Sequence, residues 1–408
     1  MKILSVHNSY QTPGGEDQVF AQEAELLRSH GHQVLLYHTS NEQVKGKNPL
    51  VLLGDTIWNK QAHSELLALM QRERPDIVHV HNTFPVISPA VYYAANEAGI
   101  PVVQTLHNFR MLCPAGTLFR DGHICEDCIG KQVPWPGVIH GCYRNSRLAT
   151  AAGAAMLATH NYKQTWSKAV SAYIALTDFA RNKFIQAGFP AEKILVKPNY
   201  LQSDPGIGEG KGNYALFVGR LTPEKGIGTL LEAWRQIGTK LPLQIAGDGP
   251  MAAEVEKASR EMPGVTWLKW LPHEEILQKM KDASVLVLTS TWFEPFGLIA
   301  AEAFAVGLPV IASDLGSMST IVDHQRMGLH FEAGNAASLV EAVRWFRAHP
   351  NETARMREQV RLEYEMKYTA ERNYAQMMNI YELVLNLSAG KDVAIPPVPV
   401  YRGTAGVA

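Results

Sequence analysis

Strand-like apolar runs alternate with amphipathic helical patterns along most of this 408-residue chain. In the first half, the strand patterns occupy residues 1–6, 33–37, 76–81, 101–106, 172–176 and 194–197, and the helical patterns occupy residues 17–29, 64–73, 90–98 and 180–186. Strands that alternate with helices in this way run parallel, because a parallel connection needs a crossover of a dozen or more residues. The alternation therefore predicts an α/β fold.

A second series of the same kind follows a glycine-rich segment at residues 203–212 (SDPGIGEGKG), which has no periodicity and predicts a linker. Its strand patterns occupy residues 215–218, 243–246, 265–269, 285–289 and 310–312, and its helical patterns occupy residues 227–237, 254–260, 274–280 and 298–305. A chain of this length is too long for one ordinary core. We therefore expect two doubly wound, Rossmann-like domains that face each other across a cleft.

The pattern also predicts where each part begins and ends. We expect a first domain at residues 1–202, with a cysteine-containing insertion at about 108–147, and a second domain at 213–368. The chain is strongly helical from residue 336 to 387, and we expect a helix at 369–387 to cross back to the first domain. Residues 388–408, with IPPVPVYRGTAGVA at 395–408, predict a mobile tail.

Charge and hydropathy exclude several classes of protein. The net charge of -1 argues against bulk nucleic-acid binding. The longest apolar candidate for a membrane span, Leu148 to Thr159, is too short to cross a bilayer. The apolar run Ile3 to Val6 is interrupted by His7 and Asn8, which is not the pattern of a secretory signal. We expect a cytoplasmic protein.

Doubly wound sheets bind ligands where their strands end, so the turns after the strands are the candidate sites. In the first half, Gly14 and Gly15 follow the first strand and allow close approach to backbone amides. They do not form the Gly-x-Gly-x-x-Gly pattern of dinucleotide binding. His107 and Asn108 follow the strand at 101–106 and place a titratable group at its end.

In the second half, two turns after strands combine glycines with charge. The loop that starts at Gly219 carries the cations Arg220 and Lys225 before a helix begins. Gly247 opens a second close-approach turn, Gly-Asp-Gly-Pro. Such loops suit an anionic ligand.

The segment EPFGLIAAE at residues 294–302 places two carboxylates eight positions apart around a glycine that opens a helix. Pro295 and Gly297 indicate that Glu294 lies on the preceding loop, while Glu302 should lie about one turn inside the helix. The amides near Gly297 and Leu298 form a helix N-terminus, which favours a phosphate.

Each of these features also has a purely structural interpretation. The glutamates can be solvated residues beside a turn, the glycines can form ordinary tight turns, and the cations can lie on a solvated loop. His107 can be a hydrogen-bonded core histidine. Their joint occurrence at strand ends favours a binding site.

The ordered set of motifs resembles a family-4 retaining glycosyltransferase of the GT-B fold, of the bacterial polysaccharide or glycolipid type, from Met1 to about Leu387. The matching pieces are PGGEDQVFAQEAELLRSHGHQV, RPDIVHVHN, IPVVQTLHN, YIALTDFARNKFIQAGFPAEKILVKPN, LFVGRLTPEKGIGTLLEAW, QIAGDGP and STWFEPFGLIAAEAFAVGLPVIASDLGSMSTIV. The set is specific, although each piece alone is weak.

The resemblance implies that the second domain binds a nucleotide-sugar donor and the first binds the acceptor. Arg220 and Lys225 would neutralise the donor diphosphate, and Glu302 would hold the ribose hydroxyls. Glu294 and the amides at 297–298 would orient the transferred sugar and its phosphate.

By the same resemblance, His107 would lie near the sugar and Gly15 near the phosphate. The remaining candidates for substrate binding are neighbours of these residues: Gly14, Asn108, Gly219, Gly247, Phe296, Gly297 and Leu298. The implied reaction moves a hexose or N-acetylhexosamine, most commonly from a UDP-sugar, to a glycan or lipid-linked acceptor in cell-surface polysaccharide synthesis.

The resemblance also implies retention of the anomeric configuration, with the departing phosphate taking the acceptor proton. No catalytic metal is expected, because Arg220, Lys225 and the helix start at Gly297 supply positive charge and the chain has no Asp-x-Asp pair. Two alternatives stay open: a nucleotide-sugar epimerase of similar fold, and a non-catalytic protein that binds nucleotide sugars. The second alternative would be expected to lose the charged site residues, which this chain has kept.

All four cysteines, Cys113, Cys125, Cys128 and Cys142, lie within one short stretch, and the middle two form a Cys-x-x-Cys turn. In a cytoplasmic protein this clustering favours a structural Zn²⁺, while free thiols or disulfides are the alternatives.

Positive charge is concentrated in the first domain, at Arg144, Arg147, Lys163, Lys168, Arg181 and Lys183. It predicts either peripheral contact with an anionic membrane that carries a lipid-linked acceptor, at the inner face of the cell membrane, or a solvated helical face.

Overall fold

The structure of the protein is a computed structural model, which describes residues 1–11, 14–44, 46 and 48–391. Of the predicted tail at 388–408, residues 392–408 lie outside the described residues. The chain divides into two compact units. Unit 1 consists of residues 1–118, 125–199 and the chain from Asn373 onward, and unit 2 consists of residues 119–124 and 200–372.

Unit 1 contains a six-stranded, all-parallel sheet with the order β2-β1-β3-β4-β7-β8. Its strands are β1 (Lys2–Ser9), β2 (Gln33–Ser40), β3 (Ile77–Asn82), β4 (Val102–Leu106), β7 (Ala172–Ala175) and β8 (Ile194–Val196). The strand order reverses between β1 and β3, which is the switch point of a doubly wound sheet. Polar side chains that follow β1, β3 and β4 therefore lie at one edge.

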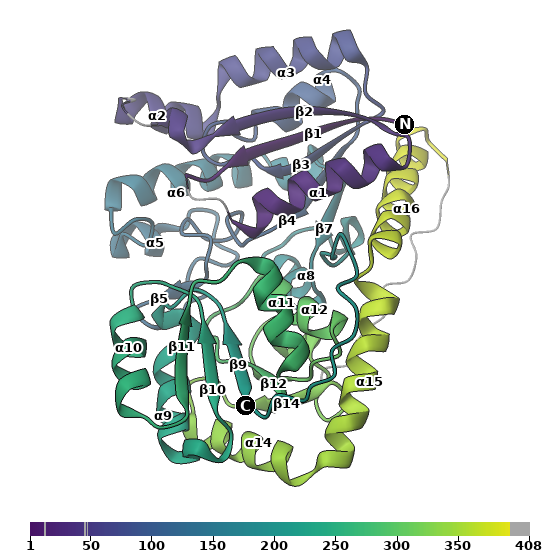
Figure 1. The fold of residues 1–408 in the computed structure, drawn as a ribbon. Coiled ribbons are helices and arrows are strands. Elements are labelled where there is room, and N and C mark those ends of the chain that lie inside the picture. Colours follow the sequence, from purple (N-terminus) through teal and green to yellow (C-terminus); the bar gives the residue numbers. More distant parts are fainter. Residues whose placement is uncertain (12–13, 45, 47, 392–408) are drawn as a thin grey trace. The chain divides into compact units, whose positions relative to one another are not determined.

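Helices cover this sheet (Figure 1). They are α1 (Gly15–Ser29), α2 (Pro49–Ile57), α3 (Lys60–Glu73), α4 (Ala90–Glu97), α5 (Trp135–His140), α6 (Arg147–Tyr162), α7 (Thr165–Lys168), α8 (Asp178–Gln186) and α16 (Ala370–Ser388), with 3₁₀ turns at η1 (Asn41–Val44) and η2 (Ala191–Lys193). The C-terminal helix α16 shares the core of unit 1 with α1 and the sheet, through Met377, Ile380, Tyr381 and Val384. Their spacing of three and four residues places all four side chains on one helix face.

Unit 2 repeats the architecture with a second all-parallel sheet, in the order β11-β10-β9-β12-β13-β14. Its strands are β9 (Ala215–Val218), β10 (Leu243–Ala246), β11 (Val265–Lys269), β12 (Val285–Leu288), β13 (Val310–Ser313) and β14 (Gly328–Phe331). Its helices are α9 (Ile227–Ile237), α10 (Ala252–Glu261), α11 (His273–Asp282), α12 (Leu298–Ala305), α13 (Met318–Ile321), α14 (Ala336–Ala348) and α15 (Pro350–Lys367), with 3₁₀ turns at η3 (Pro223–Lys225) and η4 (Gly238–Lys240).

These two sheets confirm the predicted pair of doubly wound domains. The prediction was wrong for the glycine-rich segment at 203–212, which is not a free linker but pairs with the backbone of unit 2. The amides of Gly208, Gly210 and Gly212 donate to the carbonyls of Val306, Lys281 and Asp282. A Cβ atom on Gly208 would lie 2.3 Å from the Lys281 backbone, so glycine permits this close approach.

Several short elements were not predicted: α2, α13, β14, the helix α5, and the antiparallel hairpin of β5 (Phe119–Arg120) and β6 (His123–Ile124). The apolar run at 148–159 lies in α6, with one face buried. None of the described helices is long and apolar enough to span a membrane.

Candidate active site

The loops after β9 and β10 lie backbone to backbone in unit 2. Gly219 N–H donates to the Ala246 carbonyl at 3.1 Å, and Leu221 N–H donates to the Asp248 carbonyl at 2.9 Å. A Cβ atom on Gly247, whose φ is +145°, would lie 1.9 Å from the Gly219 carbonyl oxygen. Only glycine fits there, so the predicted close-approach turn serves first to join the two loops.

Lys225 ends the first of these loops, and the segment after β12 holds it in place. A Cβ atom on Gly226, whose φ is +70°, would lie 1.8 Å from the Thr289 carbonyl oxygen. Thr289 Oγ1 donates to the Lys225 carbonyl at 2.7 Å, and Thr291 N–H donates to the Glu224 carbonyl at 2.8 Å. The Lys225 backbone is therefore fixed at the carboxyl end of the sheet.

Glu294 is buried and forms an ion pair with Lys225. Its Oε1 also accepts hydrogen bonds from Ser290 Oγ at 2.7 Å and from Trp292 Nε1 at 2.9 Å. Burial alone would raise the pKa of Glu294, but the charge of Lys225 and these hydrogen bonds outweigh it and lower the pKa. The pair brings together two predicted site residues that are far apart in sequence.

Gly297 adopts φ +91° and begins α12. A Cβ atom there would lie 2.5 Å from Met318 Cε, the flexible end of a side chain, so the left-handed backbone is the stronger reason for glycine at this position. The first amides of a helix have no partner within it, which makes this end suitable for an anion. Phe296 is buried beside it, and Leu298 is the first helical residue.

Glu302 lies in α12 and accepts a hydrogen bond from His273 Nε2 at 3.0 Å. This hydrogen bond raises the pKa of His273. His273 begins α11 and was not predicted, because no local pattern links two residues 29 positions apart. Arg220 is exposed on the loop after β9.

In unit 1, Gly14 and Gly15 are exposed at the start of α1. Gly14 N–H donates to Asp17 Oδ2 at 2.7 Å, and the other carboxylate oxygen of Asp17 lies 2.9 Å from His7 Nε2. Asp17 thus caps the helix and ties its first turn to β1.

Asn108 connects α1 with the loop after β4. Its Nδ2 donates to Tyr10 Oη and to Glu16 Oε2, each at 3.1 Å, and its Oδ1 accepts from Arg110 N–H at 2.9 Å. Burial raises the pKa of Glu16 to about 7. Glu16 Oε1 is buried and accepts no hydrogen bond from the described residues. Glu16 was missed, although its position directly after Gly14 and Gly15 was a usable signal.

His107 is buried, and its Nε2 lies 3.0 Å from His81 Nδ1. Burial lowers the pKa of His107 to about 3, so the ring is neutral at ordinary pH. His107 lines a small cavity of about 30 Å³ together with Asn108 and Arg110.

The cysteine region lies in unit 1. Cys113 and Cys128 are buried, and Cys125 and Cys142 are partly buried. Burial, followed by the charges of the other three thiols, raises the pKa of Cys128 to about 12. Among the described residues, the structure brings one set of three potential metal ligands within 4.8 Å of one another, and it is Glu23, His79 and His81 rather than the cysteines. Zinc at the cysteines therefore stays a prediction.

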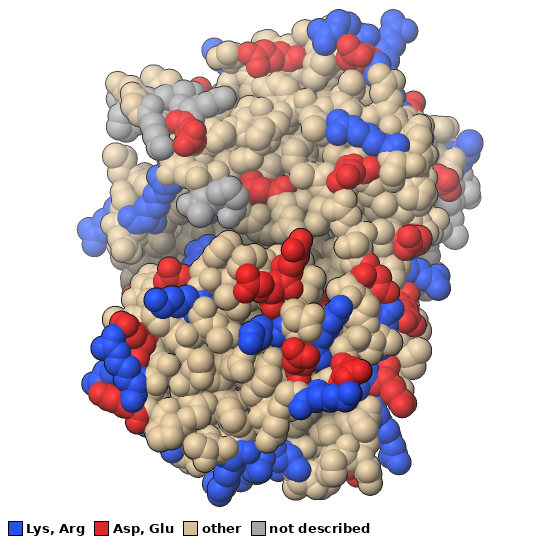
Figure 2. All heavy atoms as spheres, viewed as in Figure 1, with Lys and Arg blue, Asp and Glu red and all other residues tan. Residues whose placement is uncertain are grey.

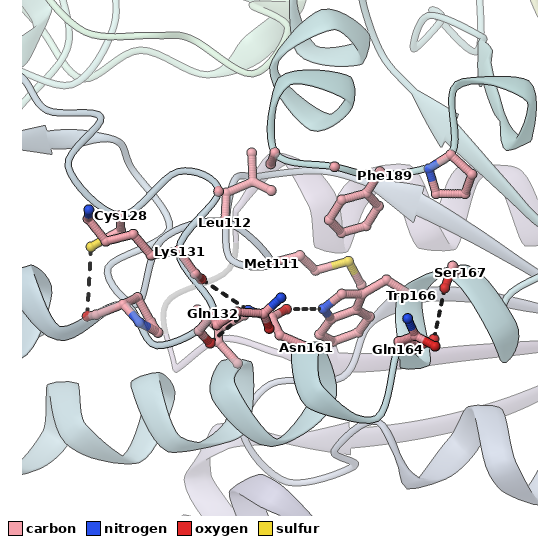
Figure 3. Close-up of a pocket in the computed structure, with 16 residues that line it drawn as sticks. Met111, Leu112, Cys128, Lys131, Gln132, Asn161, Gln164, Trp166, Ser167 and Phe189 are labelled. Atoms are coloured by element: carbon pink, nitrogen blue, oxygen red, sulfur yellow. Dashed lines mark hydrogen bonds between the residues drawn. The ribbon is translucent and has the colours of Figure 1, made fainter.

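A larger cavity of about 350 Å³ lies in unit 1, between the cysteine region, α6 and α7 (Figure 3). Asn161 spans its floor: its Nδ2 donates to the Gln132 carbonyl at 3.1 Å, and its Oδ1 accepts from Trp166 Nε1 at 2.7 Å. Figure 3 shows Cys128 and Ser167 on opposite sides of the cavity, with Phe189 between them in this view.

Sequence comparison assigns both units to known families. The profile described as Glycosyltransferase Family 4 matches residues 13–202, and the profile described as Glycosyl transferases group 1 matches residues 203–363. The chain belongs to the family-4 glycosyltransferases. The predicted family is therefore confirmed.

Relatives of this family-4 chain differ in how much of their length they share with it. The uncharacterized glycosyltransferase MJ1607 of Methanocaldococcus jannaschii is 35% identical over 133 residues, which are 31% of this chain and 34% of that protein. That match spans about a third of the relative. The phosphatidyl-myo-inositol mannosyltransferase of Mycobacterium leprae is 24% identical over 415 residues, which are 95% of this chain and 97% of that protein.

Solved structures agree on the fold. Alr3699/HepE of Anabaena, in complex with UDP, superposes with a TM-score of 0.67 at 18% identity and covers 94% of this chain and 100% of its own. Sucrose-phosphate synthase of Thermosynechococcus elongatus superposes with a TM-score of 0.67 at 17% identity and covers 95% of this chain and 99% of its own. The family-4 chain has the GT-B fold of these glycosyltransferases.

Proposed function

We propose that this protein is a retaining glycosyltransferase that moves a hexose or N-acetylhexosamine from a UDP-sugar to a glycan or lipid-linked acceptor in cell-surface polysaccharide synthesis. The observation that carries the proposal is the Lys225–Glu294 pair, held beside the start of α12 in unit 2. The UDP complex of Alr3699/HepE supports the choice of nucleotide.

The proposed reaction breaks the bond between sugar and diphosphate, so negative charge develops on the leaving group. Positive groups that are fixed before the reaction lower this barrier because they need no reorganisation. The tight backbone around Gly226 fixes Lys225, and Arg220 lies on the same loop. The first amides of α12 add hydrogen-bond donors.

Glu294 is suited to orient a sugar rather than to attack it. Lys225, Ser290 and Trp292 all contact its Oε1. Within the described part of the chain no donor is assigned to Oε2, which can accept from a sugar hydroxyl. This arrangement supports a mechanism in which no enzymic nucleophile attacks the sugar and the departing phosphate takes the acceptor proton.

A thermal-shift screen of nucleotide sugars tests the donor. A specific UDP-sugar should stabilise the protein, because a ligand that binds only the folded state raises its stability by mass action. Incubation of that donor with acceptor should yield a glycoside with the donor's anomeric configuration, read by NMR. A product of inverted configuration would contradict retention, and free sugar isomers from donor alone would indicate an epimerase.

We propose that the acceptor is a lipid-linked molecule in an anionic membrane, and that the membrane surface contacts α5 and α6 of unit 1. Three large apolar side chains on these helices are exposed: Trp135 by 54%, Ile139 by 52% and Leu148 by 66%. Lys131, Arg144, Arg147, Lys163 and Lys168 surround them in sequence, and no Asp or Glu lies between Asp127 and Asp178. Figure 2 shows Lys and Arg side chains over the left edge of unit 1, where Figure 1 places these helices.

Exposed aromatic and aliphatic residues beside cations are typical of a surface that inserts among lipid headgroups. The protein should therefore float with vesicles that contain anionic lipid and not with neutral phosphatidylcholine vesicles. Trp135→Ser with Leu148→Ser should release it, whereas Trp270→Ser, at a 70% exposed tryptophan of unit 2, should not. Equal flotation of all variants would exclude α5 and α6 as the contact.

A further inference from the structure

A chain of buried polar side chains runs through the core of unit 1 to His107. It begins at Lys197 after β8, passes through Glu23 on the inner face of α1, and continues to His81 in β3. The four residues are nearly inaccessible to solvent: Lys197 is 0% exposed, Glu23 2%, His81 3% and His107 7%. Polar groups at this depth are costly without a partner, so each of the four residues should be paired with its neighbour in the chain.

The distances define one order. Lys197 Nζ lies 2.7 Å from Glu23 Oε1, Glu23 Oε2 lies 3.7 Å from His81 Nε2, and His81 Nδ1 lies 3.0 Å from His107 Nε2. Glu23 Oε2 and His81 Nε2 are both buried, and neither has a hydrogen-bond partner among the described residues. Glu23 Oε2 lies nearer to His81 Nε2 than to His79 Nδ1, which is 3.9 Å away.

The charges along the chain are set by burial and by Lys197. Burial lowers the pKa of His81 well below its usual value and that of His107 to about 3, so each ring is neutral and carries one N–H. Burial opposes ionisation of Glu23, but the Lys197 ammonium outweighs it and lowers the pKa of Glu23. Asn373 Oδ1, on α16, accepts a further hydrogen bond from Lys197 at 3.0 Å.

Two neutral rings that share one hydrogen bond have two arrangements. If His107 donates from Nε2 to His81 Nδ1, then His81 keeps its proton on Nε2, where it faces the Glu23 carboxylate. If His81 donates instead, its Nε2 lone pair faces the Glu23 anion at 3.7 Å, which is repulsive. The carboxylate therefore selects the first arrangement.

A metal ion does not explain the same residues. Glu23, His79 and His81 have ligand atoms within 4.8 Å of one another. Both ring nitrogens of His79 are already engaged, Nδ1 by Tyr381 Oη and Nε2 by Thr105 Oγ1, each at 2.7 Å. Lys197 already provides Glu23 with a cation, so an added metal would meet like charge.

We infer that Glu23 and His81 are positioning residues that fix the tautomer of His107, with its proton on Nε2 and Nδ1 left as a hydrogen-bond acceptor. The inference rests on the proposed function only for the role of His107, in which Nδ1 receives a hydrogen bond from a hydroxyl of the sugar. The inference predicts that Nδ1 of His107 accepts a hydrogen bond from the ligand and cannot donate one. A histidine that is buried for structural reasons alone would have no such fixed tautomer.

Nitrogen NMR of the full chain labelled with ¹⁵N-histidine tests the tautomer directly, without any substrate. The His107 signals, assigned by their loss in His107→Gln, should show a protonated Nε2 and an unprotonated Nδ1. A protonated Nδ1 in the wild-type protein would overturn the inference whatever the protein's activity is.

Variants then test the cause. Glu23→Gln combined with Lys197→Met removes both buried charges together, and the glutamine amide can turn either its oxygen or its nitrogen toward His81 Nε2. The His107 proton should therefore redistribute between Nε2 and Nδ1. Tyr381→Phe, which removes the partner of His79 in the same cluster, should leave the tautomer unchanged. An unchanged His107 tautomer in the folded double variant would refute control by Glu23.

The kinetic consequence separates this inference from the proposed function. The double variant should lower kcat about tenfold, the size expected for one lost hydrogen bond, with unchanged binding of bare UDP. If no nucleotide sugar binds the wild-type protein, the proposed function fails while the NMR result still decides the tautomer. A shifted tautomer with an unchanged kcat would remove His107 from the reaction.

Discussion

The two units use the same sheet topology but treat charge at their strand ends in opposite ways. In unit 2, Lys225 and Glu294 form an ion pair beside a helix start, and Arg220 is exposed. In unit 1, His81 and His107 are held neutral by burial, and Glu16 has its pKa raised to about 7. One unit presents ready-made charge to an anion, whereas the other presents neutral polar groups that suit hydroxyl groups.

Of the changes that test this contrast, removal of Lys225 should lower turnover the most. We expect Lys225→Ala to lower turnover about 100-fold, since one lost group that stabilises a developing anion costs about 3 kcal/mol. Steady-state kinetics should show the same order of loss for Arg220→Ala, but with unchanged thermal stability because Arg220 is exposed. Arg235→Ala, at an exposed cation of α9, is the control. Wild-type turnover in Lys225→Ala would show that unit 2 does not work through its fixed charge.

The neutral character of unit 1 predicts a pH-dependent stability. Glu16 binds its proton more tightly when folded, so the protein should lose stability as pH rises from about 4.5 to about 7. Above pH 7, Glu16→Gln should be more stable than the wild type by on the order of 2 kcal/mol, and at pH 4 the two should be equal. Urea unfolding at both pH values measures this, with Glu25→Gln on the outer face of α1 as control. A constant difference at all pH values would mean that Glu16 does not titrate in this range.

A substitution at Glu302 tests nucleotide binding by unit 2 separately from catalysis. Because it would contact the ribose, Glu302→Ala should weaken binding of bare UDP about tenfold, which corresponds to about 1.4 kcal/mol. It should also remove the upward shift in the pKa of His273, which its hydrogen bond causes. Glu274→Ala, on the same helix as His273, should change neither the UDP affinity measured by calorimetry nor turnover. Unchanged UDP affinity in Glu302→Ala would place Glu302 outside the site.

The smallest expected effect is that of metal removal. Brief EDTA treatment should leave the transfer rate unchanged, because Lys225, Arg220 and the start of α12 supply the positive field. One Zn²⁺ per chain should copurify with the cysteine region, and only prolonged chelation should loosen unit 1. Elemental analysis that finds no zinc in reduced, tag-free protein would discard the cysteine site. Loss of activity in EDTA that Mg²⁺ or Mn²⁺ restores would overturn the metal-independent mechanism.

The fold was predictable where hydrophobic periodicity is long and regular. The strands of both sheets, apart from β14, and the longer helices, apart from α6, follow that periodicity directly. Short elements such as α2, α5 and β14 were missed, because few residues carry their pattern and tertiary packing decides their conformation. Residues 203–212 were mistaken for a linker, because glycine marks flexible chain and close backbone approach equally well.

The candidate site was predictable residue by residue but not contact by contact. Lys225 and Glu294 were each predicted from their turns, yet their pairing depends on how the loops after β9 and β12 pack. The contact between His81 and His107 depends on the register of β3 against β4. Sequence patterns place side chains at a sheet edge, whereas register and loop packing decide which of them meet.

Hydrogen exchange with mass spectrometry, with and without UDP in the presence of EDTA, tests most directly that unit 2 binds the nucleotide through its fixed charges. The account predicts slower exchange on UDP addition at residues 219–226, 247–250 and 296–302, with no metal required. Bound UDP that leaves these three segments unprotected, or that protects them only after a divalent metal is added, would contradict it.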